Sequence, residues 1–71
     1  MATAVRLETP GSVWQLLVAE GDQVTAGQTL FVMEVMKMEV PYEAPVTGTV
    51  ADLRIAEGQV VEEGDLALTL T

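Results

Sequence analysis

The sequence GSVWQLLVAEGDQVTAGQ at residues 11–28 recurs with substitutions as GTVADLRIAEGQVVEEGD at residues 48–65. The alignment extends without a gap from 11–34 to 48–71, at a constant offset of 48 − 11 = 37 residues. Solenoid repeats need three or more stacked units, so two units favour a closed structure with two halves related by pseudo-twofold symmetry. The identical pairs are Gly11/Gly48, Val13/Val50, Leu16/Leu53, Ala19/Ala56, Glu20/Glu57, Gly21/Gly58, Val24/Val61 and Gly27/Gly64.

Short runs of valine, threonine and leucine separated by glycines indicate β-strands and turns along the chain. The stretch 18–24 comes nearest to a helical pattern, but Gly21 divides it. We therefore predict one all-β domain over residues 1–71, a flattened barrel or sandwich of about eight short strands in two symmetric halves. The glycines expected to form structural turns are Gly21, Gly27, Gly48, Gly58 and Gly64.

The charge balance excludes several classes of function. Three cations face eleven carboxylates, which gives a net charge of −8. Nucleic acids and anionic membranes attract basic surfaces, so neither is an expected partner. Cysteine and histidine are absent, which argues against disulfides, thiolate chemistry, the usual zinc sites and imidazole catalysis, and we expect no metal site. The nearly apolar run 30–36 contains Glu34 and is too short to span a bilayer, and residues 1–8 lack the apolar core of a signal peptide. We therefore expect a cytoplasmic protein.

The segment LFVMEVMKMEVPYE at 30–43 joins the two halves and reads as a hairpin whose turn is centred on Met36-Lys37. A register slip of one residue would scatter its apolar residues over both faces, so the hairpin has one favoured register. On the apolar face this register pairs Val35 with Met38, Met33 with Val40 and Phe31 with Tyr42. On the other face it pairs Glu34 with Glu39, Val32 with Pro41 and Leu30 with Glu43.

The turn itself conflicts with local preferences. Two-residue hairpin turns favour Asn-Gly or Asp-Gly, because both central residues often have positive φ. Met36-Lys37 is a poor choice there, and local rules broken at an exposed point often mark a functional site. Lys37 is also the only lysine of the chain, and the symmetry places it opposite the point where the chain ends meet.

These residues carry a family resemblance. The sequence Glu34-Val-Met-Lys-Met38, followed by Ala44-Pro-Val-Thr-Gly48, resembles the attachment motif of biotinyl domains, the biotin carboxyl carrier proteins. The flanking GDQVTAGQ at 21–28 and its echo at 58–65 fit the same biotinyl/lipoyl family, and the likeness covers essentially the whole chain. The gap-free repeat is similar to the short type without a protruding thumb. The resemblance implies the flattened eight-stranded "hammerhead" barrel, with biotin joined through an amide to Lys37.

The resemblance also implies partners and a function. A biotin protein ligase would attach the biotin, and the domain would carry a carboxyl group from a biotin carboxylase to a carboxyltransferase. The system would be of the acetyl-CoA or acyl-CoA carboxylase type, as used in fatty acid biosynthesis, and the domain would catalyse nothing alone. By the same resemblance, the residues recognised by the ligase or carboxylase are Glu34, Val35, Met36 and Met38; Val35 stands where relatives often have alanine.

Other interpretations remain open at this point. A lipoyl carrier of a 2-oxoacid dehydrogenase or glycine cleavage system shares the fold, although its lysine usually follows Asp and lacks the methionine pair. An unmodified β-barrel interaction module would carry no adduct, and Lys37 would then be an ordinary solvated lysine. Met36 and Met38 could be core residues, and Trp14 a core or rim residue. Glu34 and Glu39 are better explained as solvated charge than as a catalytic pair.

Overall fold

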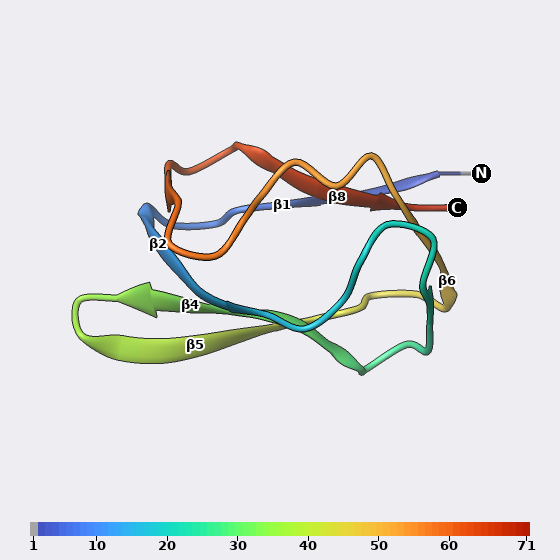
Figure 1. Ribbon diagram of the computed structural model, residues 1–71, viewed down its shortest axis with the longest axis horizontal. Helices are drawn as coiled ribbons and strands as arrows, with labels where there is room; N and C mark the ends of the chain where they lie inside the picture. The colour runs from blue at the N-terminus through green and yellow to red at the C-terminus, as the bar shows by residue number, and fades with distance from the viewer. Residues whose placement is uncertain (1) are drawn as a thin grey trace.

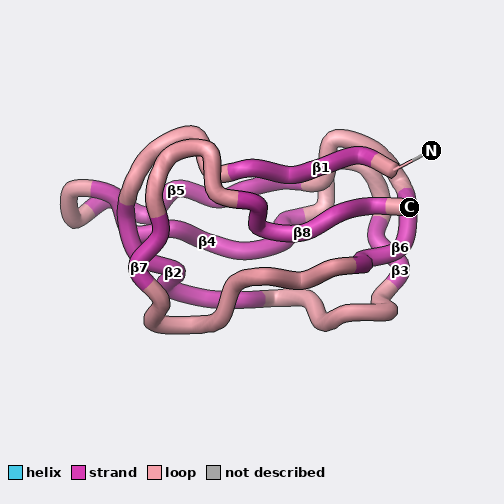
Figure 2. Tube along the Cα trace, turned by 90° about the horizontal axis from the view of Figure 1, so that it is seen from above, coloured by secondary structure: helices cyan, strands magenta, loops and turns pink. Residues whose placement is uncertain are grey.

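The computed structural model describes residues 2–71 and contains two four-stranded antiparallel sheets that form two layers (Figures 1 and 2). The prediction of an all-β fold with eight strands is confirmed, and no helix is present among residues 2–71. One sheet has the strand order β1-β8-β6-β3 and the other β5-β4-β2-β7. The strands are β1 (Thr3–Arg6), β2 (Gly11–Leu16), β3 (Gln23–Val24), β4 (Thr29–Val35), β5 (Met38–Glu43), β6 (Gly48–Ala51), β7 (Val60–Val61) and β8 (Leu66–Leu70).

The pseudo-twofold relation between the halves is confirmed by hydrogen bonds that repeat at the offset of the sequence repeat. The amide of Gly21 donates to the carbonyl of Val50 at 2.8 Å, and the amide of Gly58 donates to that of Val13 at 2.7 Å. Side-chain caps repeat as well: an Asp22 carboxylate oxygen accepts from the Ala19 amide, and the Gln59 amide oxygen accepts from the Ala56 amide. Each half therefore uses the same turns, and each sheet contains strands from both halves.

The glycines serve two different purposes. The expectation of a turn at Gly48 is wrong, because Gly48 lies in β6 and does not have positive φ. A Cβ at Gly48 would lie 2.8 Å from the carbonyl oxygen of Thr71, and one at Gly11 would lie 2.6 Å from that of Glu34. The lack of a side chain at Gly11 and at Gly48 therefore allows the backbones of Glu34 and Thr71, respectively, to approach closely. The glycines with φ between 85° and 95°, as turns of this kind require, are Gly21, Gly27, Gly58 and Gly64.

The core lies between the two sheets and fixes the base of the hairpin that carries Lys37. Phe31 and Met33 of β4 are fully buried, as are Leu68 and Leu70 of β8 on the facing sheet. Burial of each such side chain contributes about 1.5–3 kcal/mol. No polar or charged residue is buried in the part of the chain that the structure describes. The result is a molecule 32 Å long, with the β4–β5 turn at one end and the start of β1 beside the end of β8 at the other (Figure 1).

Candidate attachment site at the hairpin tip

The β4–β5 hairpin has the predicted register at five of its six pairs. The exception is the predicted pairing of Leu30 with Glu43: the register shifts between Thr29 and Phe31, and Thr29 lies opposite Glu43 instead. The irregularity allows Leu30 and Phe31, two successive residues, both to be fully buried, which strict alternation would forbid. The confirmed pairs are Val35–Met38, Glu34–Glu39, Met33–Val40, Val32–Pro41 and Phe31–Tyr42.

The turn has the conformation that its residues disfavour. Met36 has φ 51° and Lys37 has φ 64°, so both central residues lie in the left-handed region. That region costs roughly 1–2 kcal/mol for an L-residue with a Cβ. The conflict expected from the sequence is therefore present in the structure, and the paired strands below the turn maintain the strained conformation.

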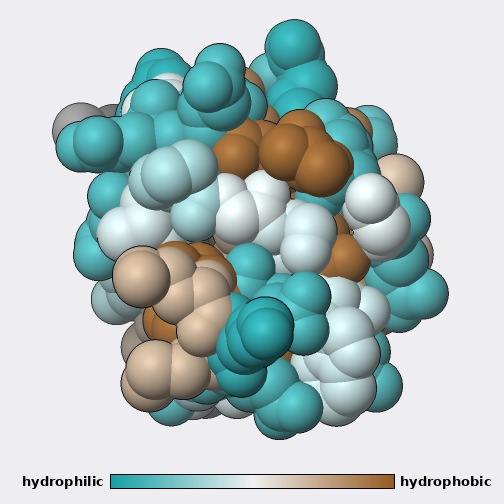
Figure 3. Space-filling model, turned by 90° about the vertical axis from the view of Figure 1, so that its left-hand side faces the viewer, coloured by the Kyte–Doolittle hydropathy of each residue, from teal (hydrophilic) through white to brown (hydrophobic). Residues whose placement is uncertain are grey.

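The side chains at the tip are presented to solvent. Met36 is 90% exposed and Met38 is 66% exposed, so neither belongs to the core. Lys37 is exposed as well, and the one ion pair found among residues 2–71 joins Arg54 to Asp52 at the other half of the molecule. Among residues 2–71 the Lys37 amine has no hydrogen-bond or ion-pair partner, so another protein's active site can reach it. Figure 3 views this end of the molecule and shows apolar surface, tan to brown, beside strongly polar teal surface.

The base of the hairpin is fastened to the rest of the fold. The Tyr42 ring stacks on Phe31 with centroids 4.7 Å apart, and its hydroxyl accepts a hydrogen bond from the Glu8 amide at 3.0 Å. Val35, below the turn, is partly buried against the core. The hairpin is therefore held both by core packing and by the loop that joins β1 to β2. A hollow of about 300 Å³ lies between them, lined by Glu8, Thr9, Val35, Val40, Pro41, Tyr42 and Glu43.

No arrangement near Lys37 resembles a catalytic or metal centre. Glu34 and Glu39 are exposed and face each other across the two strands. Within residues 2–71, no three carboxylate side chains gather in a way that could hold a cation. The site consists of an exposed amine on a hairpin whose base is buried, and this amine can accept a covalent group.

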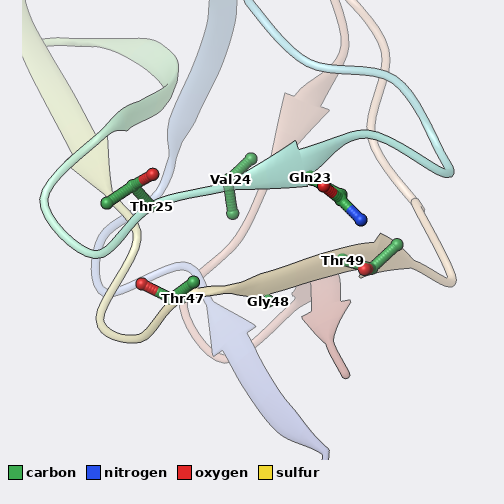
Figure 4. A pocket seen from close by; sticks show the side chains of 6 residues that line it. All are labelled: Gln23, Val24, Thr25, Thr47, Gly48 and Thr49. Carbon is green, nitrogen blue, oxygen red and sulfur yellow. The ribbon is translucent and has the colours of Figure 1, made fainter.

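Figure 4 shows a second hollow, of about 440 Å³. The strands that line it, β3 and β6, lie at the end of the molecule opposite the β4–β5 turn (Figure 2). The lining of this hollow contains no charged side chain. The Thr47 hydroxyl accepts a hydrogen bond from the Ala26 amide at 3.0 Å, so this group supports the loop. The hollow is lined by Gln23, Val24, Thr25, Thr47, Gly48 and Thr49.

Comparison with known proteins agrees with this geometry. The biotin/lipoyl family model, described as "Biotin-requiring enzyme", matches residues 1–70. The chain is 41% identical to a biotinylated protein TB7.3 homolog of Mycobacterium leprae (strain TN), with all of both chains covered. It is 39% identical to a biotin/lipoyl attachment protein of Bacillus subtilis (strain 168), over 94% of this chain and 92% of that protein.

A solved structure described as a single-chain, multi-domain long-chain acyl-CoA carboxylase contains a similar fold. It superposes on 99% of this chain with a TM-score of 0.92 and 34% sequence identity, and the matched region is 7% of that much longer chain. A TM-score of 0.90 relates this chain to the urea carboxylase of Kluyveromyces lactis, at 32% identity over 6% of that protein.

The fold and these comparisons thus define a domain of the biotinyl type. The chain belongs to the biotin/lipoyl family of biotin-requiring enzymes. The prediction of a biotinyl domain that uses covalent biotin is confirmed at this level. Within residues 2–71 there is no helix of the length and hydropathy that a bilayer crossing requires.

Proposed function

We propose that this chain is a biotin carboxyl carrier that is biotinylated on Lys37 and carries a carboxyl group between a biotin carboxylase and a carboxyltransferase. The observation that supports the proposal most is the position of the only lysine of the chain. Lys37 stands on a strained two-residue turn at the far end of a hairpin, with a methionine on each side and no partner for its amine among residues 2–71. Membership of the family of biotin-requiring enzymes would explain an exposed lysine of this kind, since a biotin carrier needs an amine to which biotin can be joined.

The residues at the tip fit covalent biotin. The exposed Lys37 amine leaves room for the valeryl arm, and no neighbouring side chain within residues 2–71 competes for it. In the attachment step the Lys37 nitrogen forms a bond to the activated biotin carbonyl carbon, the activating group departs, and the nitrogen loses a proton. The nitrogen must be neutral to attack, so the biotin protein ligase must provide a group that takes up its proton. Attached biotin supplies a ureido nitrogen that holds the carboxyl group.

The contribution of the chain is presentation, not catalysis. The buried base of the hairpin sets the direction in which the Lys37 arm projects, and the arm then samples the two enzyme sites. We propose that the ligase and the carboxylase recognise Glu34, Val35, Met36 and Met38 around it. The net charge of −8 favours docking on basic enzyme surfaces, whereas nucleic acids and membranes are not proposed as partners.

The carboxylase relatives suggest the wider system. The mitochondrial acetyl-CoA carboxylase of Saccharomyces cerevisiae (strain Lalvin EC1118 / Prise de mousse) and the acyl-CoA carboxylase structure each contain a region similar to this chain. We propose that the carrier serves a cytoplasmic enzyme of the acetyl-CoA or acyl-CoA carboxylase type and has no activity of its own.

Intact mass after co-expression with an active biotin ligase tests the attachment. We expect one biotin on the wild-type protein and none on Lys37→Arg, which keeps the positive charge and the length but removes the primary amine. Because the amide is neutral, the net charge should change from −8 to −9, visible as faster migration on a native gel. A lipoyl mass, or an unmodified wild-type chain, would contradict the proposal.

A further inference from the structure

The sheet β5-β4-β2-β7 carries a row of apolar side chains on its outer face, which turns away from β1 and β8 (Figure 1). Val13 points into the core, so Trp14 points outward, where it is 51% exposed. The irregularity between Val13 and Gln15 places Trp14 beside Val32 of β4. The row crosses all four strands and consists of Val60, Trp14, Val32 and Pro41; we call it the Trp14 face.

Val60 completes the row at its outer edge. It is 78% exposed and pairs with Ser12 on β2, two residues before Trp14. Side chains in this diagonal relation on one face of an antiparallel pair lie about 7–8 Å apart, within reach of an aromatic ring. Trp14 and Val60 therefore form one apolar surface, in contrast to the singly scattered apolar residues that are normal on proteins.

The pseudo-twofold symmetry provides an internal control for this surface. Pairings of the same kind occur on the other sheet, where Gln23 pairs with Thr49, Ala51 with Thr69 and Ala4 with Thr69. The residues at the positions equivalent to Val60, Trp14, Val32 and Pro41 are Gln23, Ala51, Thr69 and Ala4. The same architecture thus forms without large apolar residues at these positions, so folding does not require the Trp14 face.

Charge and position indicate what would cover this face. Glu34 and Glu39 face each other one step nearer the turn, between Val32–Pro41 and Lys37. Neither carboxylate takes part in an ion pair among residues 2–71. The surface therefore has an apolar centre with a half-exposed tryptophan and a negative border on the side of the attachment lysine. Protein interfaces have this construction, in which aromatic side chains dominate the centre and rim charges guide association.

We propose that the Trp14 face is the docking surface for an enzyme component that uses the Lys37-linked group, through an apolar patch on that enzyme bordered by Arg or Lys. This rests on the proposed function and extends it from the tip to the side of the domain. Contact along the outer face of β4 and β5 holds the carrier while the tip enters the enzyme site. The ligase, in contrast, acts on the tip alone.

The test exchanges residues between the twofold-related faces. Trp14→Ala with Val60→Gln gives the Trp14 face the residues that Ala51 and Gln23 provide on the other face. Gln23→Val is the matched control, since it makes the reverse exchange at the equivalent position. Each protein is biotinylated, quantified by streptavidin gel shift, and checked by thermal melting. Carboxylation and decarboxylation rates are then measured against carrier concentration with the biotin carboxylase and the carboxyltransferase of the same organism.

We expect the double variant to be biotinylated at the wild-type rate and to raise the KM for the carrier by about tenfold or more with at least one enzyme, as loss of an interface hot spot does. The kcat should change less than twofold, and Gln23→Val should match wild type. Glu34→Gln with Glu39→Gln should weaken the dependence of that KM on salt. If the double variant proves unstable, Val60→Gln alone, at a highly exposed position, should still raise the KM severalfold.

Three results would overturn the proposal. Unchanged KM with both enzymes for a correctly biotinylated double variant would remove the docking role and leave the attachment at Lys37 intact. Dimerisation of wild type that the double variant loses, seen by analytical ultracentrifugation, would assign the face to a second copy of this chain. Absence of biotin from Lys37 in wild type would refute the proposed function, and the docking role with it.

Discussion

Replacing Met36 by asparagine should stabilise the unmodified domain, although it changes the centre of the attachment site. Met36 is the first central residue of the hairpin turn and has φ 51°, with its side chain 90% exposed. A turn with positive φ at both central residues favours asparagine at this position. Asparagine tolerates the left-handed region because its short side chain can form local hydrogen bonds, whereas a long apolar side chain gains nothing there.

The size of the effect follows from the turn. The left-handed conformation costs roughly 1–2 kcal/mol for an ordinary L-residue, and asparagine should recover about 1 kcal/mol of this. Because Met36 is almost fully exposed, its removal sacrifices little apolar burial. In a domain of this size, about 1 kcal/mol corresponds to an increase in Tm of roughly 4–8 °C. Urea titration and thermal melting of the unmodified protein measure both quantities.

Met36→Leu is the matched control, since leucine keeps the apolar character and has no preference for positive φ. Its stability should lie within about 0.5 kcal/mol of wild type. Biotin loading by the ligase should slow in Met36→Asn in spite of its higher stability. An asparagine variant no more stable than the leucine variant would refute the argument that backbone strain is stored at this position.

The remaining predictions concern the support below the tip. Met33→Ala should destabilise the domain by ~2 kcal/mol or more because Met33 is fully buried, whereas Met38→Leu should cost less than ~1.5 kcal/mol and change biotin loading or carboxyl transfer instead. Wild-type loading and turnover in Met38→Leu would contradict a recognition role for that methionine. Gly58→Ala should cost about 1 kcal/mol because its φ is +85° in open space. Gly48→Ala should cost more, since its Cβ would meet the Thr71 carbonyl at 2.8 Å; urea titration would refute this ranking if the order were reversed.

The hairpin was predictable because its information is local. Side chains alternate between faces along a strand, so Phe31, Met33 and Val35 could lie on one face in only one register, and this register centred the turn on Lys37. The repeat predicts where the hairpin lies in the fold, because a twofold relation with an offset of 37 residues places the turn opposite the termini. Periodicity and symmetry are properties of the sequence itself, so the sequence alone predicts the hairpin and its position.

The features that escaped prediction depend on residues distant in the chain. Leu30 is buried because the strand pairing is irregular between Thr29 and Phe31. That irregularity depends on the space left by the facing sheet, and an alternating pattern of side chains does not predict it. The role of Gly48 depends on the backbone of Thr71, which passes beside it only in the folded state. The sequence predicts Trp14 as a core or rim residue because tryptophan side chains are on average highly buried, whereas Val13 and the irregularity of β2 direct it outward.

Backbone strain at Met36 and Lys37 disfavours the turn, whereas burial of the strand residues below it favours the turn. An isolated Met-Lys turn would relax out of the left-handed region, since each of its two residues costs free energy there. It does not relax, because a different turn would shift the register and bring Phe31 and Met33 out of the core, at about 1.5–3 kcal/mol each. Burial of these two residues outweighs the strain at the tip. The direction of the Lys37 side chain is thus set by core residues four and six positions away in the sequence, and a substitution at Phe31 or Met33 would disturb carrier function without touching the attachment site.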